Sequence, residues 1–401
     1  MARRILYGAI VLLLVAIASV GALAGALWLT RAAPSRLVAL AGPSALSLLD
    51  RQQARTLASD VSVDTYGFPA PSPDGARLAF VSHRGDATAI SVLDIASGQR
   101  RELAAVGSEP LALAWSPDGR YLVYLLGGGR TTHIVAADGS QPAKLIASGG
   151  PSYYVWSPDG STLLLHLGGH STDGGTVAIY RPGDEQARPL LADPGLFQAP
   201  AWSRDGTAFY YVSQPPLAGA PSAESIKSRI MRARPQGGDP VQLIDEGFSD
   251  VRLVRSPKTD QIAYLLTTIE TTGTLKLIDG AGGAARPISR PDETVTSFFW
   301  SPDGTQIAYL TSVGSYAPDG RRRWHIATVA SGHIEDMAEF TPSTSFAQFQ
   351  AFFDAYTFSF SPWSPDSAAL AYGTSEGVYT LDVASGRYSR RSDGTMAVWV
   401  R

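Results

Sequence analysis

Residues 373–377 read Gly-Thr-Ser-Glu-Gly and match the Gly-x-Ser-x-Gly spacing of a hydrolase nucleophile. In such enzymes the serine stands on a sharp turn between a strand and a helix, and the histidine of the triad follows it in the chain. Here two β-rich runs flank the motif, and the last histidine, His333, precedes it. The segment is therefore predicted to be a hairpin loop, and the sequence assigns no catalytic residue.

His166 and His170, four residues apart and close to Asp173, have the residue types of a metal site. A helix would place the two imidazoles one turn apart on one face, close enough to share a metal, but the glycine pairs around them indicate a strand end and a loop. Phosphate-binding glycine motifs are absent from the sequence. We therefore predict no metal site and no cofactor. The other histidines fall in separate segments without a shared cluster: His83, His133, His325 and His333.

The composition restricts the class of protein. The 401 residues include no cysteine, which excludes disulfides, thiolate nucleophiles and cysteine-ligated metals. A net charge of −3 is not that of a nucleic-acid-binding protein, and 44% hydrophobic residues are too many for a disordered chain. Forty glycines and 27 prolines, with only 17% charged residues, are typical of many short strands joined by tight turns.

A turn signal recurs along the chain. Ser-Pro-Asp-Gly begins at residues 72, 116, 157 and 301, and degenerate copies begin at 203, 256 and 364. Proline fixes φ at the first central position, aspartate hydrogen-bonds its own backbone, and glycine accepts a positive φ. We therefore assign these residues a structural role as turns: Asp74, Gly75, Asp118, Gly119, Asp159, Gly160, Asp205, Gly206, Asp303 and Gly304.

Each copy is followed by three β-rich runs, and a tryptophan precedes the serine in five of the seven copies. Four strands per unit, repeated at this spacing, predict an all-β propeller. The pattern in Ala-Trp-Ser-Pro-Asp-Gly-Arg-Tyr-Leu-Val-Tyr (114–124) resembles the WD40-like repeat of TolB-type β-propellers. The resemblance covers nearly all of residues 36–401 and implies this fold. Such propellers serve as binding platforms, receptors and accessory domains of peptidases, so the resemblance implies little about function.

The ends of the chain indicate the number of blades. The runs 36–42, 45–51 and 54–60 resemble strands two to four of a unit, and 396–401 resembles a first strand. Pairing of 36–60 with 396–401 would complete an eighth blade and remove the open edges of the ring. We predict eight four-stranded blades within residues 36–401. Seven blades remain as the alternative if residues 36–60 form only a stalk.

Residues 5–30 carry no charge and are long enough to cross a bilayer as a helix. The positive residues Arg3 and Arg4 precede this run, which predicts a cytoplasmic N-terminus at 1–4, a single-pass anchor and a short linker at 31–35. The alternative is a cleaved signal peptide, because Ala22-Leu23-Ala24 forms a cleavage-site pattern. Both alternatives place the propeller outside the cytoplasm, either attached to the cell membrane or secreted.

Three long insertions, 214–228, 312–323 and 337–358, join strands two and three or successive units, and these connections share one face of a propeller. The first two read as loops. In the third, Thr341-Pro342 predicts the start of a helix. An apolar stripe follows at helical spacing: Phe346, Phe349, Phe353 and Tyr356.

This stripe has two interpretations. It packs on the propeller and caps the channel mouth, or part of it contacts a ligand, since Phe352 and Phe358 lie off the line. Arg321, Arg322 and Arg323 would add an anionic contact in the second case. The candidate binding residues are Phe346, Phe349, Phe352, Phe353, Tyr356, Tyr316, Arg321 and Arg322.

The sequence thus favours a membrane-anchored, extracytoplasmic propeller that binds an unidentified protein or small ligand on the insertion-bearing face, with no nucleic acid as partner. The alternative is an enzyme of hydrolase or lyase type, with a pocket at the channel mouth of that face. A cluster of ionisable residues with shifted pKa values at the mouth would favour the enzyme. A mouth lined by phenylalanine, tyrosine and leucine would favour binding.

Overall fold

The structure of the chain is a computed structural model. The described residues are 36–41, 44–49, 54–61, 68–169, 174–192, 194, 198–213, 228–245, 250–267, 272–314, 320–356 and 359–400. The predicted segments 1–4, 5–30 and 31–35 lie outside them. Within the described residues, no helix is both long and apolar enough to span a membrane.

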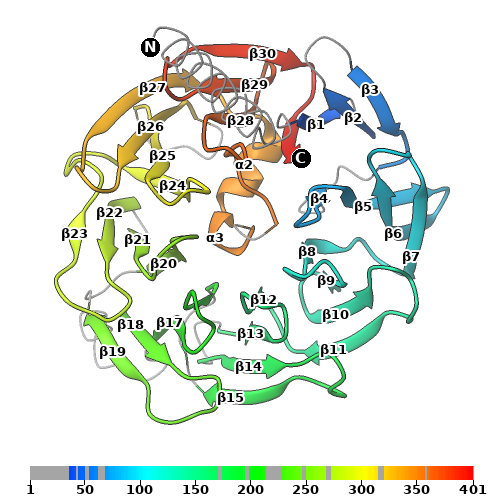
Figure 1. The fold of residues 1–401 in the computed structure, drawn as a ribbon, viewed down its shortest axis with the longest axis horizontal. Coiled ribbons are helices and arrows are strands. Elements are labelled where there is room, and N and C mark those ends of the chain that lie inside the picture. The colour runs from blue at the N-terminus through cyan, green and yellow to red at the C-terminus, as the bar shows by residue number, and fades with distance from the viewer. Residues whose placement is uncertain are drawn as a thin grey trace, which may run out of the picture.

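The described strands form eight antiparallel sheets arranged as a ring around a central axis (Figure 1). Each blade runs outward from its first strand. The first four blades, in this inside-to-outside order, consist of β31 (Met396–Val400), β1 (Arg36–Ala41), β2 (Ala45–Leu49) and β3 (Ala54–Ala58); β4 (Ala70–Pro71), β5 (Arg77–Arg84), β6 (Ala87–Asp94) and β7 (Arg100–Val106); β8 (Leu111–Trp115), β9 (Tyr121–Leu126), β10 (Thr131–Ala136) and β11 (Lys144–Ser148); and β12 (Ser152–Trp156), β13 (Leu163–Leu167), β14 (Thr176–Tyr180) and β15 (Arg188–Ala192).

The second half of the ring repeats this pattern. Its blades are β16 (Ala201–Trp202), β17 (Phe209–Ser213), β18 (Arg229–Ala233) and β19 (Val241–Asp245); β20 (Asp250–Arg255), β21 (Ile262–Thr267), β22 (Thr272–Ile278) and β23 (Arg286–Pro287); β24 (Val295–Trp300), β25 (Gln306–Ser312), β26 (Arg322–Thr328) and β27 (Ile334–Phe340); and β28 (Ala369–Thr374), β29 (Gly377–Asp382) and β30 (Tyr388–Ser392). In the eighth blade the innermost strand is reduced to one bridge, between Trp363 and Leu370.

The first blade joins the two ends of the described chain. β1 pairs antiparallel with β31, with Arg36 opposite Val400 and Leu40 opposite Met396. The prediction of an all-β propeller with eight blades is therefore confirmed. The predicted hairpin at 373–377 is also present, because β28 ends at Thr374 and pairs there with Gly377, the first residue of β29.

The repeated turns join the first and second strands of the blades and share one geometry. In the copy at 116–119, the Ser116 hydroxyl donates to Asp118 Oδ1 at 2.6 Å, and the Arg120 amide donates to the same oxygen at 3.0 Å. The Gly119 amide donates to the Ser116 carbonyl at 2.8 Å, and Gly119 has a φ of 71°. The left-handed φ explains why glycine recurs at this position.

The tryptophan before each turn connects neighbouring blades. In four of the five blades that have it, its indole Nε1–H donates to a backbone carbonyl of the preceding blade, for example from Trp115 to Ala70 at 2.8 Å, whereas the Nε1 of Trp156 has no such partner. Trp399 of β31 donates to Pro362 of the eighth blade at 2.8 Å, so the closing strand uses the same contact. The same bond is made by Trp202 to Val155, Trp300 to Val254 and Trp363 to Phe299.

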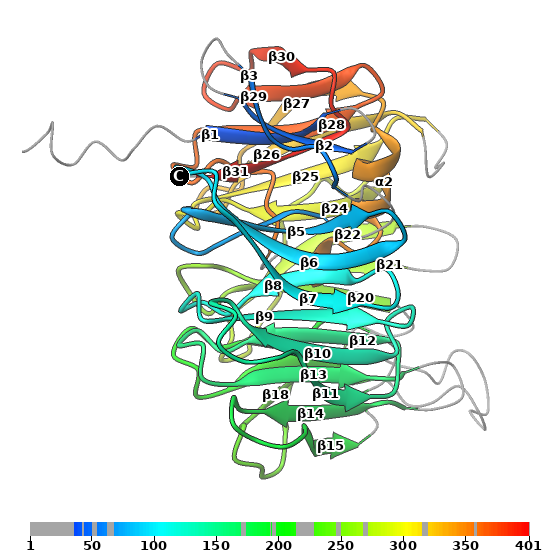
Figure 2. The ribbon, with the colours of Figure 1, turned by 90° about the vertical axis from the view of Figure 1, so that its right-hand side faces the viewer.

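The ring has two different faces. The turns define the turn face, which lies on the left in Figure 2, on the same side as the start of β1 and the end of β31. The opposite face, here the insertion face, carries the connections between second and third strands and between blades. Helix α2 (Thr344–Gln350) lies toward this face, and α3 (Phe353–Tyr356) follows it near the axis of the ring (Figures 1 and 2).

The predicted insertions need three corrections at their ends. β26 begins at Arg322 and β27 continues to Phe340, so the strands take residues that were assigned to the loops. The helix begins at Thr344 with Ser343 as N-cap, not at Thr341-Pro342, because Pro342 lies extended and bridges Thr374. Most of the predicted loop 214–228 and the centre of 312–323, which includes Tyr316, lie outside the described residues.

Candidate functional site

The two short helices of the insertion face form a plug over the ring axis, here defined as residues 343–356. The Ser343 side chain accepts a hydrogen bond from the Phe346 amide at 3.2 Å and caps α2. The Ser343 amide donates to the Gly373 carbonyl at 3.1 Å. Gly373 has no room for a Cβ, which would lie 1.8 Å from the Thr395 carbonyl oxygen. The start of the plug is therefore seated closely against the eighth blade and the closing blade.

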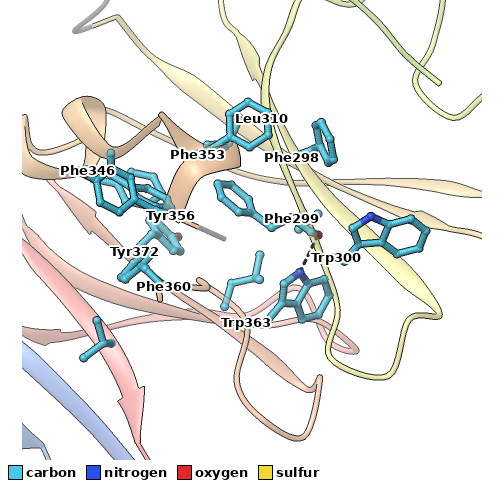
Figure 3. Close-up of a cluster of buried hydrophobic side chains, with 14 of the residues drawn as sticks. Phe298, Phe299, Trp300, Leu310, Phe346, Phe353, Tyr356, Phe360, Trp363 and Tyr372 are labelled. Carbon is cyan, nitrogen blue, oxygen red and sulfur yellow. Dashed lines mark hydrogen bonds between the residues drawn. The ribbon is translucent and has the colours of Figure 1, made fainter. Parts of the chain in front are cut away.

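The predicted aromatic stripe is buried beneath the plug. Phe346, Phe349 and Phe353 have no exposed surface, and Tyr356 is 6% exposed. The Phe349 ring stacks on Phe299 at a centroid distance of 5.6 Å. Figure 3 shows Phe346, Phe353 and Tyr356 within one buried aromatic cluster that also contains Phe298, Trp363 and Tyr372. The stripe thus fixes the plug onto the propeller, as the first interpretation of the sequence expects.

An ion pair attaches the other end of the plug to the sixth blade. Asp354 of α3 is 2% exposed, and its Oδ1 lies 3.5 Å from the Arg252 Nη1 of β20. The same guanidinium donates to the Ala351 carbonyl between α2 and α3. The plug is consequently held from two sides of the ring.

A cavity of about 230 Å³ lies between the plug and the third and fourth blades. The plug cavity, as it is called below, is bounded on one side by Phe352, Ala355 and Tyr356. The other described residues that line it are Leu111, Ala112, Leu125, Gly128, Gly129, Pro151, Ser152, Tyr153 and Tyr154. None of these described lining residues has a carboxylate, ammonium, guanidinium or imidazole group.

Tyrosine supplies most of the polar groups that border the plug cavity. Tyr154 is 8% exposed, and its hydroxyl donates to the Val123 carbonyl at 3.2 Å. Burial raises the pKa of Tyr154 well above its usual value, so the phenol stays neutral over the physiological range. The plug cavity therefore offers aromatic and aliphatic surface with neutral hydroxyls.

Unusual backbone opens the wall formed by the third blade. Ala112 has a φ of 52°, in the left-handed region, and the pairing of β8 with β9 shifts register between Leu111 and Ala114. Gly128 and Gly129 also have positive φ, and they present no side chains to the plug cavity. Backbone strain of this kind is concentrated at functional sites in proteins.

The remaining predicted binding residues are not all brought to this cavity. Phe352 is half-buried and lines it. Arg321 pairs with Glu339, and Arg323 pairs with the same carboxylate, whose pKa is lowered chiefly by the hydrogen bond from Arg323. Arg322 is 2% exposed and donates to the Gly320 carbonyl at 2.9 Å. These arginines, on the seventh blade, are not among the described residues that line the plug cavity.

Ionisable groups do gather on the seventh blade, although no cluster is predicted there from the sequence. His325 is 2% exposed, and its Nδ1 lies 2.9 Å from Asp336 Oδ1 and 3.6 Å from Glu293 Oε1. His325 Nε2 lies 2.8 Å from the Thr311 hydroxyl. Burial lowers the pKa of His325, so the ring is neutral near pH 7.

Two chemical functions are conceivable for this ionisable cluster. Its carboxylates and imidazole have the ligand types of a cation site, and the order Thr311–His325–Asp336 resembles a hydroxyl–imidazole–carboxylate triad. However, Arg290 Nη1 lies 2.6 Å from Glu293 Oε1 and 2.7 Å from Asp336 Oδ1. The guanidinium therefore already neutralises the negative charge of the two carboxylates that would bind a cation. Thr311 is only 6% exposed, which leaves little access for a substrate. The geometry is that of a satisfied polar network.

The mouth of the channel on the turn face forms a second cavity, of about 350 Å³. Its rim consists of Pro71, Pro73, Pro302 and Pro365, and Trp399 lies beside it. Val400, the last residue of β31, also lines this cavity. It lies opposite Arg36, the first residue of β1. The described chain therefore enters and leaves the ring at the rim of this mouth.

Comparison with known proteins identifies the architecture. The family model of the TolB beta propeller domain matches residues 46–265. No curated protein matches the chain. A putative TolB from Agrobacterium tumefaciens is a similar solved structure, with 16% identity, a TM-score of 0.45, and coverage of 71% of this chain and 96% of the other.

Two enzymes are also similar in fold. Oligogalacturonate lyase in complex with manganese has 14% identity and a TM-score of 0.51, with coverage of 90% of this chain and 86% of the lyase. Dipeptidyl peptidase 4 from Porphyromonas gingivalis has 14% identity and a TM-score of 0.55, with coverage of 90% of this chain and 59% of the peptidase. At these identities the likeness concerns the fold alone.

Proposed function

The chain belongs to the TolB β-propeller domain family, and from this premise we propose that it is an extracytoplasmic binding module whose ligand enters the plug cavity. The ligand is a small molecule, or a side chain of a partner protein, with an uncharged and mainly apolar surface. Residues 5–30 hold the module on the membrane, as their length and lack of charge favour.

One observation carries the proposal: the cavity beside the plug is lined by apolar side chains, glycine, one serine and tyrosine, with no charged group among its described residues. Removing a charged ligand from water is costly unless a charged or hydrogen-bonding partner replaces the water. Burial of apolar surface is favourable, at about 25 cal/mol per Å². An apolar cavity of about 150 Å³ accommodates benzene, so the plug cavity at about 230 Å³ has room for one or two rings.

The alternative of an enzyme on the same face receives less support. Acid–base catalysis needs a group of suitable pKa within reach of the substrate. The ionisable cluster around His325 belongs to the seventh blade, whereas the plug cavity lies against the third and fourth. The likeness to a lyase and a peptidase supplies no residue at the plug cavity, because it concerns only the fold.

The test compares uncharged and charged probes of similar size. Saturation-transfer NMR would measure binding of indole and p-cresol, with benzoate and benzylamine as charged counterparts, to the propeller fragment 36–401. Residues 36–400 hold both strands that close the ring, so the fragment keeps every interface between the blades. We expect signal from the uncharged probes only.

Ala355→Leu tests the position of the site. Ala355 is half-buried and lines the plug cavity, so added bulk there should reduce probe binding at least tenfold without loss of fold. Ala351→Leu is the matched control, because Ala351 is exposed and lies outside the described lining of the plug cavity. Equal binding by both variants would reject the site. Preferential binding of the charged probes would reject the ligand class and favour the enzyme.

A further inference from the structure

The position of β1 decides which face of the ring is turned toward the membrane. Arg36 is the first residue of β1 and lies opposite Val400, the last residue of β31. In the other blades the first strand ends at the repeated turn, as β8 ends at Trp115 before Ser116. Arg36 is therefore at the turn face, where Figure 2 shows the start of β1 and the C-terminal label on one side.

The point of entry is also close to the ring axis. β1 is the second strand of its blade counted from the axis, and its partner β31 is the first. Val400 lines the central cavity of the turn face together with residues of three other blades, among them Pro71, Pro302 and Pro365. An anchored chain that enters near the axis attaches the ring at the middle of its turn face. This favours an upright ring, with its axis perpendicular to the bilayer.

The linker is too short to allow the opposite orientation. Residues 31–35 separate the predicted span from β1, and five residues reach at most about 17 Å. From Arg36, a path to the insertion face crosses the outer strands β2 and β3 and then the height of the blade, together about 30 Å. The insertion face therefore cannot be brought against the membrane surface.

The chemistry of the turn face indicates a hydrated gap rather than insertion into lipid. Five aspartate carboxylates lie on the turns of this face, and that of Asp118 pairs with Arg120. Moving such charged groups from water into lipid is costly. These carboxylates belong to Asp74, Asp118, Asp159, Asp205 and Asp303. The linker length accommodates a layer of water and counterions between the face and the headgroups.

From this geometry we infer that the turn face is directed toward the lipid surface and that the plug cavity opens away from it, an inference that rests on the proposed anchoring by residues 5–30. The ligand then reaches the plug cavity from the aqueous side of the extracytoplasmic space. A second consequence is that the bilayer faces the mouth beside Trp399 and the proline rim.

The absence of cysteine permits a direct test on the full chain. Single-cysteine variants, each labelled with a donor fluorophore, would be reconstituted in phosphatidylcholine vesicles that contain an acceptor-labelled lipid. Gln141→Cys and Ser148→Cys form a matched pair, because both residues are exposed and flank the two ends of β11. β11 itself covers about 13 Å along the blade, and Gln141 lies three residues before its first residue, Lys144.

A second pair controls for tilt of the ring. Ser331→Cys and Thr341→Cys flank β27 on the seventh blade, and both residues are exposed. We expect higher energy transfer from the label at position 141 than at 148, and higher transfer from 331 than from 341. Equal or reversed transfer in both pairs would overturn the orientation, and opposite results in the two pairs would overturn the upright ring.

The anchor itself is tested in the same preparation. Extraction of the vesicles with alkaline carbonate should leave the full chain in the membrane fraction. Release of the chain into the soluble fraction would refute the anchor, and with it the inferred orientation. Retention of the chain with the wrong transfer pattern would refute the orientation alone. Probe binding in the plug cavity is measured separately on fragment 36–401 and is independent of both outcomes.

Discussion

The two faces of the ring are built by different means. On the turn face, a serine, an aspartate and a glycine make the same contacts in one blade after another, within six residues of each other. On the insertion face, α2 and α3 bring a single buried aromatic cluster to the axis, and it exists once. Because the turn contacts are local, one copy can change its sequence without affecting the others. In the copy that begins at residue 256, Lys258 stands at the position of the aspartate. The plug, in contrast, depends on partners from distant parts of the chain.

The largest expected effect is on the buried side of the plug. Phe349→Ala removes a ring with no exposed surface that stacks on Phe299 and lies 4.3 Å from the Phe360 ring centroid. Truncation of a buried phenylalanine costs about 3–5 kcal/mol of unfolding free energy. Urea unfolding of the two proteins measures the difference.

Phe352→Ala is the matched control for this prediction. Phe352 is half-buried beside the plug cavity, so its loss should cost clearly less free energy of unfolding and should reduce probe binding. An equal loss of unfolding free energy in both variants would contradict this picture, in which Phe349 lies on the buried side of the plug and Phe352 on the side that faces the cavity.

The sequence predicts the two faces unequally well. Repeats at 72, 116, 157 and 301 are sufficient for the turns, because proline, aspartate and glycine act through their own backbone. The aromatic stripe at 346–356 is predictable from helical spacing alone, and its burial agrees with one of the two interpretations. Both signals lie within a short stretch of chain.

The walls of the plug cavity were not predictable from the sequence. Its walls combine Leu111 and Tyr154 with Phe352, which are separated by some two hundred residues. The left-handed Ala112 has no sequence signature, since glycine or asparagine is expected at positive φ. A run of three glycines at 127–129 and the tyrosine pair at 153–154 were the available signals, but neither identifies its spatial partner.

The ionisable cluster was equally hidden. His325, Glu293 and Asp336 belong to different strands and connections of the seventh blade, and each is an ordinary residue in its own segment. Strand pairing brings Asp336 opposite His325. Register, not spacing in the chain, creates the contact, which is why a search for histidine clusters in the sequence found none.

A second prediction uses the pH dependence of stability that this cluster confers. Burial keeps the pKa of His325 below its usual value of about 6.5, so the unfolded chain binds a proton at a higher pH than the folded chain does. The stability contributed by the neutral ring is present above pH 6.5 and is lost as the pH falls below it. The slope for one proton is at most about 1.4 kcal/mol per pH unit.

His325→Gln should remove the part of this slope that His325 contributes between pH 7.5 and pH 5, as measured by urea unfolding at each pH, while His133, whose pKa burial also lowers, keeps its own part. His333→Gln is the control, since His333 is exposed on the turn between β26 and β27. Retention of the full slope in His325→Gln would show that the acid response near neutrality comes from elsewhere. A slope lost equally in both variants would contradict the role of burial.

The smallest expected effect is on the turn face. Asp205 accepts hydrogen bonds from the Ser203 hydroxyl at 2.8 Å and the Thr207 amide at 3.0 Å. Asp205→Ala removes these exposed contacts and should cost about 1 kcal/mol of unfolding free energy. Lys258→Ala is the control at the same position of a degenerate turn, and it should leave the free energy of unfolding almost unchanged.

The pH dependence of this last loss tests its cause. The hydrogen bond from the Thr207 amide is the largest of the contacts that lower the pKa of Asp205 to about 2. The carboxylate therefore contributes stability that is fully present above its unfolded pKa of about 3.9 and is lost as the pH falls toward 2. The difference between the native chain and Asp205→Ala should persist from pH 8 to pH 5 and shrink below pH 4. A difference that changes near pH 6.5 instead would mean that the turn is coupled to a group that titrates there, and the contact of Asp205 would not be local.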